Sequence, residues 1–67
     1  MDPFSRISLS DQESAVLRHA AVGLTDREIA QKMSVSEKTI DTYWSRIRQK
    51  LNARNRTHAV AIAYREA

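Results

Sequence analysis

The sequence predicts an all-α domain built from four short helices. Its 67 residues include one glycine and one proline, so few positions would interrupt a helix. Apolar and polar residues do not alternate as they do along half-buried strands. Residues that favour helix N-termini stand ahead of the apolar-periodic segments. A chain of this length can form one small core and buries only ~60% of its unfolded surface.

Capping boxes predict the first two helices. The stretches "SDQE" and "TDRE" occupy residues 10–13 and 25–28. In each, the first hydroxyl can accept from the amide three residues on, and the glutamate can reach back to the cap amide. The helices they start should cover about 11–22 and about 26–33, with Gly23 suited to a left-handed end of the first.

Two further helices follow a short turn. Ser36 is the predicted N-cap of a helix over 37–51, and Asn52 can end that helix in a left-handed conformation. Asn55 is a plausible cap for a last helix over 56–65. Only three or four residues separate the second and third helices. This is the spacing of a helix-turn-helix, whose second helix reads DNA.

The expected domain organisation is simple. We expect residues 1–8 to form a flexible N-terminal arm and residues 9–67 to form one domain. The start of the chain does not resemble a signal peptide, and no apolar run reaches the ~18 residues of a membrane helix. The absence of cysteine excludes disulfides and thiolate metal sites. It also suits a reducing compartment.

Positive charge gathers in the second half of the chain. Residues 1–33 hold four cations and five anions, whereas residues 34–67 hold seven cations and three anions. Phosphate contacts supply most of the non-specific affinity of nucleic-acid-binding proteins. The distribution therefore favours a polyanionic partner, and a solvated basic surface is the alternative.

The predicted third helix has two distinct sides. One side gathers the large apolar residues and should face the core: Ile40, Tyr43, Trp44, Ile47 and Leu51. The opposite side and its edges carry polar residues: Lys38, Asp41, Thr42, Ser45, Arg46 and Gln49. Short polar side chains let a helix lie deep in a major groove and reach base edges, while cations at the rim contact phosphates.

Asp41 is unusual on such a surface because it would face a polyanion. A carboxylate can accept from the amino group of cytosine and repels the carbonyl of guanine, so it would lower affinity and increase selectivity. Alternatively, Asp41 pairs with Lys38 or Ser45 on an exposed helix face.

Three stretches together resemble the LuxR/GerE-type helix-turn-helix DNA-binding domain of bacterial transcription regulators. They are "LSDQESAVL", "GLTDREIAQKMSVSEKTIDTYWSRIRQKL" and "ARNRTHAVAIA". The resemblance covers roughly residues 9–63. No single motif is specific, but the joint spacing is.

The resemblance implies a LuxR C-terminal-like fold with residues 37–51 in the major groove. It implies base contacts by Asp41, Thr42 and Ser45. It implies phosphate contacts by further residues: Lys38, Thr39, Arg46, Lys50 and Arg54. The expected partners are double-stranded DNA, a second copy on DNA and RNA polymerase. The expected location is the cytoplasm, associated with the nucleoid, without membrane contact.

The sequence departs from the family pattern at several positions. Asp41 and Ser45 stand where relatives often carry basic residues, Tyr43 replaces a frequent histidine, and Asn52 a frequent glycine. The operator therefore cannot be transferred from a relative. Family members usually carry a sensory or receiver domain ahead of this module. We expect either an excised response-regulator output domain or a stand-alone regulator.

The predicted last helix is apolar on two sides. The run "AVAIAY" covers residues 59–64, and Val60 and Ile62 fall on different sides of the helix. One side would contact the core and the other a symmetric partner. We expect Ala59 and Ile62 at this dimer contact. Alternatively, the alanines are simply good helix formers and Ile62 is a lone exposed apolar residue.

Other classes of protein are less consistent with the sequence. His19 and His58 lie far apart without metal-ligand spacing, and no catalytic constellation or phosphate loop is visible, so we expect no enzyme and no cofactor. A promoter-reading sigma-factor domain shares the helix-turn-helix, but the apolar fourth helix suits the LuxR-type module. A protein-interaction module would instead expose Trp44, Ile62 and Tyr64.

Overall fold

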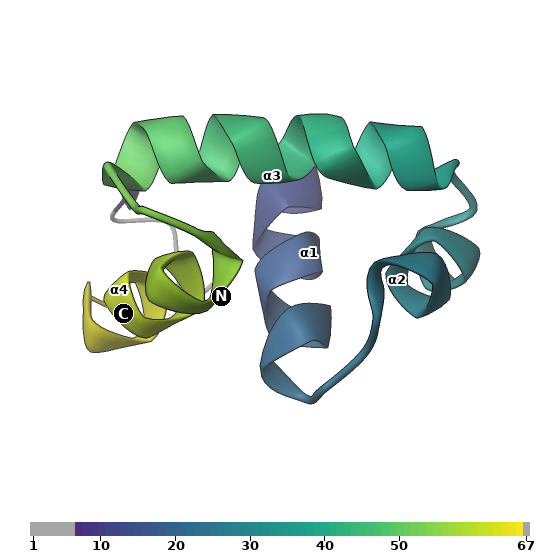
Figure 1. Cartoon of the computed structure of the whole chain (residues 1–67), viewed down its shortest axis with the longest axis horizontal. Helices are drawn as coiled ribbons and strands as arrows, with labels where there is room; N and C mark the ends of the chain where they lie inside the picture. Colours follow the sequence, from purple (N-terminus) through teal and green to yellow (C-terminus); the bar gives the residue numbers. More distant parts are fainter. Residues whose placement is uncertain (1–6, 67) are drawn as a thin grey trace.

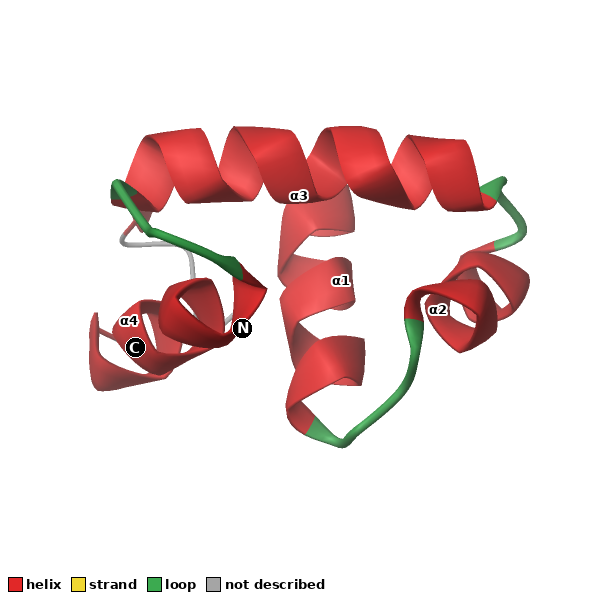
Figure 2. Ribbon diagram, viewed as in Figure 1, coloured by secondary structure: helices red, strands yellow, loops and turns green. Residues whose placement is uncertain are grey.

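The computed structural model describes residues 7–66, which form four helices and no strand (Figures 1 and 2). The helices are α1 (Asp11–Ala21), α2 (Asp26–Met33), α3 (Glu37–Leu51) and α4 (Arg56–Glu66). The all-α prediction is confirmed, and each boundary lies within one residue of the predicted one. None of these helices is long and apolar enough to cross a membrane.

Helix α3 lies along one edge of the domain, and the other helices lie on one side of it (Figure 1). Helix α1 runs away from the middle of α3, with α2 and α4 on either side of α1. Both α1 and α3 pack against every other helix, whereas α2 and α4 do not pack against each other in this way. The side of α3 that faces away from α1 is left open.

The core lies where α3 meets the other three helices. Its buried residues come from all four helices and from the segment ahead of α1: Leu9, Val16, Leu17, Ile29, Ala30, Ile40, Trp44, Ile47, Ala59 and Ala63. Trp44 is only 3% exposed, so its predicted place in the core is confirmed. The apolar side predicted for the third helix is the side that packs.

The predicted helix caps are present. Ser10 and Glu13 exchange hydrogen bonds of 2.9 and 3.1 Å, and Thr25 forms the same box with Glu28. Ser36 caps α3. The carbonyl oxygen of the Asn55 side chain accepts from the His58 amide at 2.8 Å, as expected of a cap for α4.

Left-handed residues end the two central helices. Asn52 follows α3 with a φ of 54°, which confirms the prediction. Gly23, one residue beyond the C-cap of α1, has a φ of 94°. Ser34 ends α2 with a φ of 58°, a left-handed conformation that was not predicted. A left-handed residue turns the chain sharply, so that α3 starts close to the end of α2.

The expected N-terminal arm lies mostly outside the described residues, because residues 1–6 are not among them. The two residues of the arm that are described contact the domain. Ile7 packs against the core, and the carbonyl of Ser8 accepts from Lys50 at 3.4 Å.

Candidate nucleic-acid interface

The open side of α3 carries the three residues predicted to contact bases. Asp41, Thr42 and Ser45 are all exposed, whereas Ile40, Trp44 and Ile47 of the same helix are buried. The Thr42 hydroxyl donates to the Lys38 carbonyl at 3.2 Å. The result is a helix surface without long apolar side chains, as close approach to base edges requires.

The Asp41 carboxylate has no partner within the described part of the chain. No hydrogen bond or ion pair joins it to Lys38 or Ser45, the two neighbours with which it could pair on a helix. Ser45 instead accepts a long hydrogen bond of 3.5 Å from Arg48. Asp41 is therefore an exposed acceptor on a surface that also carries cations.

The predicted phosphate-contacting residues fall into two groups. Lys38 and Arg46 of α3 are exposed, and so is Arg54, which follows the end of α3. Thr39 is half-buried, and its hydroxyl shares a 3.0 Å hydrogen bond with the Ser36 hydroxyl at the start of α3. The Thr39 side chain therefore serves the helix cap.

Lys50 differs from the other cations because it is tied to α1. Its ammonium donates to Glu13 Oε1 at 2.7 Å and to the Ser8 carbonyl at 3.4 Å. An ammonium has three donors, so one remains for a phosphate. Lys50 is thus both a structural contact and a candidate phosphate contact.

Glu13 is the buried partner of Lys50, and the sequence identified it only as a cap. Its side chain is 2% exposed. Burial acts to raise the pKa of Glu13, but the hydrogen bond and charge of Lys50, together with hydrogen bonds from Ser10, lower the pKa overall. The carboxylate stays ionised at neutral pH and fixes the end of α3 to the start of α1.

A second carboxylate holds the middle of α3. The Trp44 indole Nε1 donates to Asp26 Oδ1 at 3.0 Å, and Arg56 donates to Asp26 Oδ2. The Arg56 guanidinium lies 5.1 Å from the centre of the Trp44 ring. Sequence reasoning missed this cluster because its members are 18 and 30 residues apart, and no local pattern links them.

The structure separates the two residues expected at a dimer contact. Ala59 is 0% exposed and packs inside the core, so its expected place on an open face of α4 is wrong. The reason is that α4 approaches its neighbours through its alanines, and Ala63 is equally buried. Ile62 is half-buried and lies on another side of the helix.

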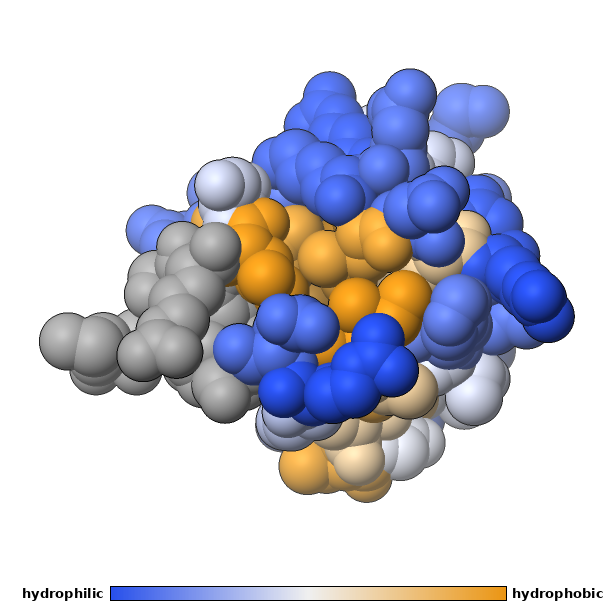
Figure 3. Space-filling model, turned by 90° about the vertical axis from the view of Figure 1, so that its left-hand side faces the viewer, coloured by the Kyte–Doolittle hydropathy of each residue, from blue (hydrophilic) through white to orange (hydrophobic). Residues whose placement is uncertain are grey.

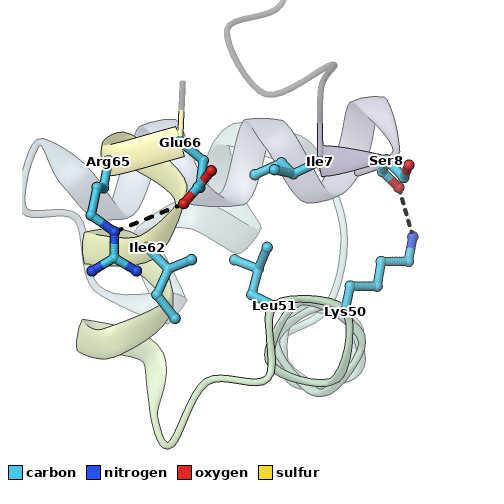
Figure 4. Close-up of a pocket in the computed structure, with 7 residues that line it drawn as sticks. All are labelled: Ile7, Ser8, Lys50, Leu51, Ile62, Arg65 and Glu66. Carbon is cyan, nitrogen blue, oxygen red and sulfur yellow. Dashed lines mark hydrogen bonds and ion pairs between the residues drawn. The ribbon is translucent and has the colours of Figure 1, made fainter.

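Ile62 lines an open apolar groove of about 610 Å³ beside the end of α3. The side chains of Ile7, Leu51 and Ile62 point toward one another across it (Figure 4). Figure 3 shows apolar surface at the centre of this side of the domain, with hydrophilic residues around much of it. At one edge of the groove, Arg65 and Glu66 form an ion pair of 3.9 Å.

Groups of histidine and carboxylate side chains able to hold a metal are absent from residues 7–66. The geometry instead defines one class of protein. A short helix, a tight turn and a longer helix with an open polar side form a helix-turn-helix.

Comparisons with known proteins give the family. Residues 7–63 match the family described as bacterial regulatory proteins, luxR family. The chain belongs to the LuxR family of bacterial regulatory proteins, and it is a DNA-binding domain of the type found in transcription regulators.

Several relatives are transcription regulators by name. The chain is 44% identical to the transcriptional regulatory protein YxjL of Bacillus subtilis over 64 residues, which are 96% of this chain and 27% of YxjL. It is 42% identical to the DNA-binding transcriptional activator DevR/DosR of Mycobacterium tuberculosis over 62 residues, or 92% of this chain and 28% of that protein. It is 40% identical to the activator EvgA of Escherichia coli over 58 residues, 87% and 28% of the two chains. The chain therefore spans little more than a quarter of the length of these relatives.

Proposed function

We propose that this domain binds double-stranded DNA sequence-specifically, as the output domain of a bacterial transcription regulator, with α3 in the major groove. One observation carries the proposal. Helix α3 packs its apolar side against the core and leaves Asp41, Thr42 and Ser45 exposed. Exposed cations at both edges can hold the phosphate backbone on either side of the groove.

The three exposed residues have separate roles in this proposal. Asp41 accepts from the amino group of a cytosine, while Thr42 offers a methyl group to a thymine. Ser45 can donate or accept. Lys38, Arg46 and Arg54 bind phosphates, and Lys50 adds a phosphate contact near the end of α3.

Selection of bound sequences from a random duplex library tests the proposal. At low and at physiological salt, we expect one enriched half-site and an affinity that falls steeply with salt. Recovery of random sequences at both salts would contradict sequence-specific binding. An affinity for another protein that does not depend on salt would support the protein-interaction alternative, although Trp44, one of the three residues that alternative needs, is buried.

Asp41→Asn tests base reading by a single residue. The variant should bind random DNA more tightly and lose preference at one base position, by about 1–3 kcal/mol. Asp11→Asn is the matched control, because it removes the same charge from an exposed position in α1. An unchanged ranking of bound sequences in Asp41→Asn would sink the role of this carboxylate.

We also propose that two copies pair on DNA through the surface around Ile62. The groove beside Leu51 leaves apolar area that a second copy could cover. The selected site would then be an inverted repeat with centres about one helical turn apart. Ile62→Glu should reduce binding to that of a half-site, whereas Ala61→Glu places the same charge on an exposed position of α4 and should not. Equal binding by both variants would remove the dimer from the proposal.

The proposed role implies a partner and a cellular location. A regulator that acts on promoters would work beside RNA polymerase, and its place would be the cytoplasm, where the chromosome lies. The role is one of binding, without catalysis.

A further inference from the structure

The carboxylate of Asp26 joins three helices at one point. Asp26 is the first residue of α2, Trp44 lies in the middle of α3, and Arg56 is the first residue of α4. The two oxygens of the carboxylate are divided between them, with Oδ1 accepting from the indole and Oδ2 from the guanidinium. Apart from this link, α2 and α4 pack only weakly against each other, unlike the remaining helix pairs. Asp26 therefore decides where the Arg56 side chain lies.

Arg56 has access to a second carboxylate. A shallow hollow beside α3 is lined by Asp41 and Trp44 of α3 and by Arg56 of α4. Asp41 is the one carboxylate among the residues that line this hollow, and it has no partner in the described chain. The Arg56 side chain is 46% exposed, so it can change its conformation without unpacking the core.

We propose that Asp26 is a positioning residue that holds Arg56 away from Asp41 and so keeps the Asp41 carboxylate available to DNA bases. The inference rests on the proposed function, because it assumes that Asp41 reads a base. It adds a specificity-determining residue, Asp26, that lies on α2 and contacts no base itself.

The physical reason is competition between two carboxylates for one guanidinium. Asp26 is partly shielded from water, with a side chain that is 20% exposed, whereas Asp41 is exposed. Ion pairs shielded from solvent are screened less than exposed ones, so Arg56 prefers Asp26. The Trp44 ring adds a cation–π contact on the same side. Without the charge of Asp26, the exposed Asp41 becomes the alternative partner.

Three variants isolate this competition. Asp26→Asn keeps an oxygen that can accept from the Trp44 indole, but it removes the charge that holds Arg56. Asp11→Asn is the matched control, because Asp11 is the first residue of α1 as Asp26 is of α2. Asp26→Asn combined with Arg56→Gln has the net charge of the original chain and lacks the Arg56 guanidinium.

The measurement is the ratio of affinities for the selected duplex and for a scrambled duplex at the same salt. Both single variants should bind the scrambled duplex more tightly, since each loses one anion. The ratio of the two affinities should be at least about five-fold lower in Asp26→Asn than in Asp11→Asn, as expected for residues in one network. The double variant should regain the original ratio. Trp44, the only tryptophan, reports by its fluorescence and melting curve that each variant is folded.

The outcomes are distinct. Equal ratios for Asp26→Asn and Asp11→Asn would overturn the positioning role while leaving the proposed function intact. A double variant that stays as unselective as Asp26→Asn would show that Arg56 is not the cause, and it would also overturn the inference. If the original chain selects no sequence at all, the proposed function fails, and the inference fails with it.

Discussion

Helices α3 and α4 pack against α1 in different ways. Both contact α1, and they contact each other. Helix α3 fills the core with large side chains, Ile40, Trp44 and Ile47, whereas α4 buries only Ala59 and Ala63. Large residues on one side of a helix provide stability, and small residues let two backbones approach closely. Helix α3 can carry both the core and the proposed DNA-binding side because its two sides are separate, while α4 has no such separation.

The largest expected effect comes from truncating the core side of α3. Ile47→Ala should lower the free energy of unfolding by about 2–5 kcal/mol, because it removes a fully buried side chain and leaves a cavity. Ile62→Ala, at a half-buried position of α4, should cost clearly less. Urea unfolding followed by circular dichroism measures both. Equal losses would contradict the distinction between the two helices.

The opposite substitution tests the close approach of α4. Ala63→Leu should destabilise the domain by about 1–3 kcal/mol, since the added atoms have no space in the core. Ala61→Leu adds the same atoms to an exposed position of the same helix and should change stability by at most about 0.5 kcal/mol. Thermal unfolding of the pair gives the answer. A tolerated leucine at 63 would mean that α4 is not closely packed.

A smaller effect concerns the ion pair that fixes the end of α3. Lys50→Met should cost about 1–2 kcal/mol at neutral pH, because the buried Glu13 loses its charged donor. Lys38→Met, at an exposed position, is the control and should have little effect.

The same ion pair predicts a pH dependence. The pKa of Glu13 is lowered from 4.5 in the folded state, so its contribution to stability is complete above that value and is lost as pH falls through the folded pKa. The pKa of Glu28 is also lowered, by hydrogen bonds with the Thr25 amide and hydroxyl. Glu28 therefore adds the same pH dependence to the stability of the original chain and of the variant. Lys50→Met should therefore lose less stability than the original chain on acidification below pH 4.5. Parallel pH profiles would show that Lys50 does not control this carboxylate.

The smallest expected effect on stability lies in the turn between α3 and α4. Asn52→Gly should raise the free energy of unfolding by up to about 1 kcal/mol, because glycine adopts a left-handed conformation without steric cost. Asn55→Gly, at the cap of α4, should do the reverse by removing the hydrogen bond to the His58 amide. Thermal melting compares them, and a destabilising Asn52→Gly would mean that the asparagine side chain matters more than its backbone.

The sequence predicted the features that depend on neighbouring residues. The four helices, their caps and the apolar side of α3 follow from patterns within a few residues, and all of them are present. It did not predict the burial of Glu13, the contact of Asp26 with Trp44, or the place of Ala59 in the core. Each of these depends on how helices distant in sequence come together. An alanine in particular carries no sign of which side of its helix will be covered.

The cap hydrogen bonds have a consequence for how the domain forms. They join residues three apart, whereas the contacts of Asp26 and Glu13 with α3 span 18 and 37 residues. Contacts between near neighbours close with little loss of chain entropy, so the helix ends can form before the chain collapses. Small helical domains of this kind fold in microseconds to milliseconds. A transient opening of the domain should therefore be brief, and α3, the helix proposed to bind DNA, should regain its shape soon after each opening.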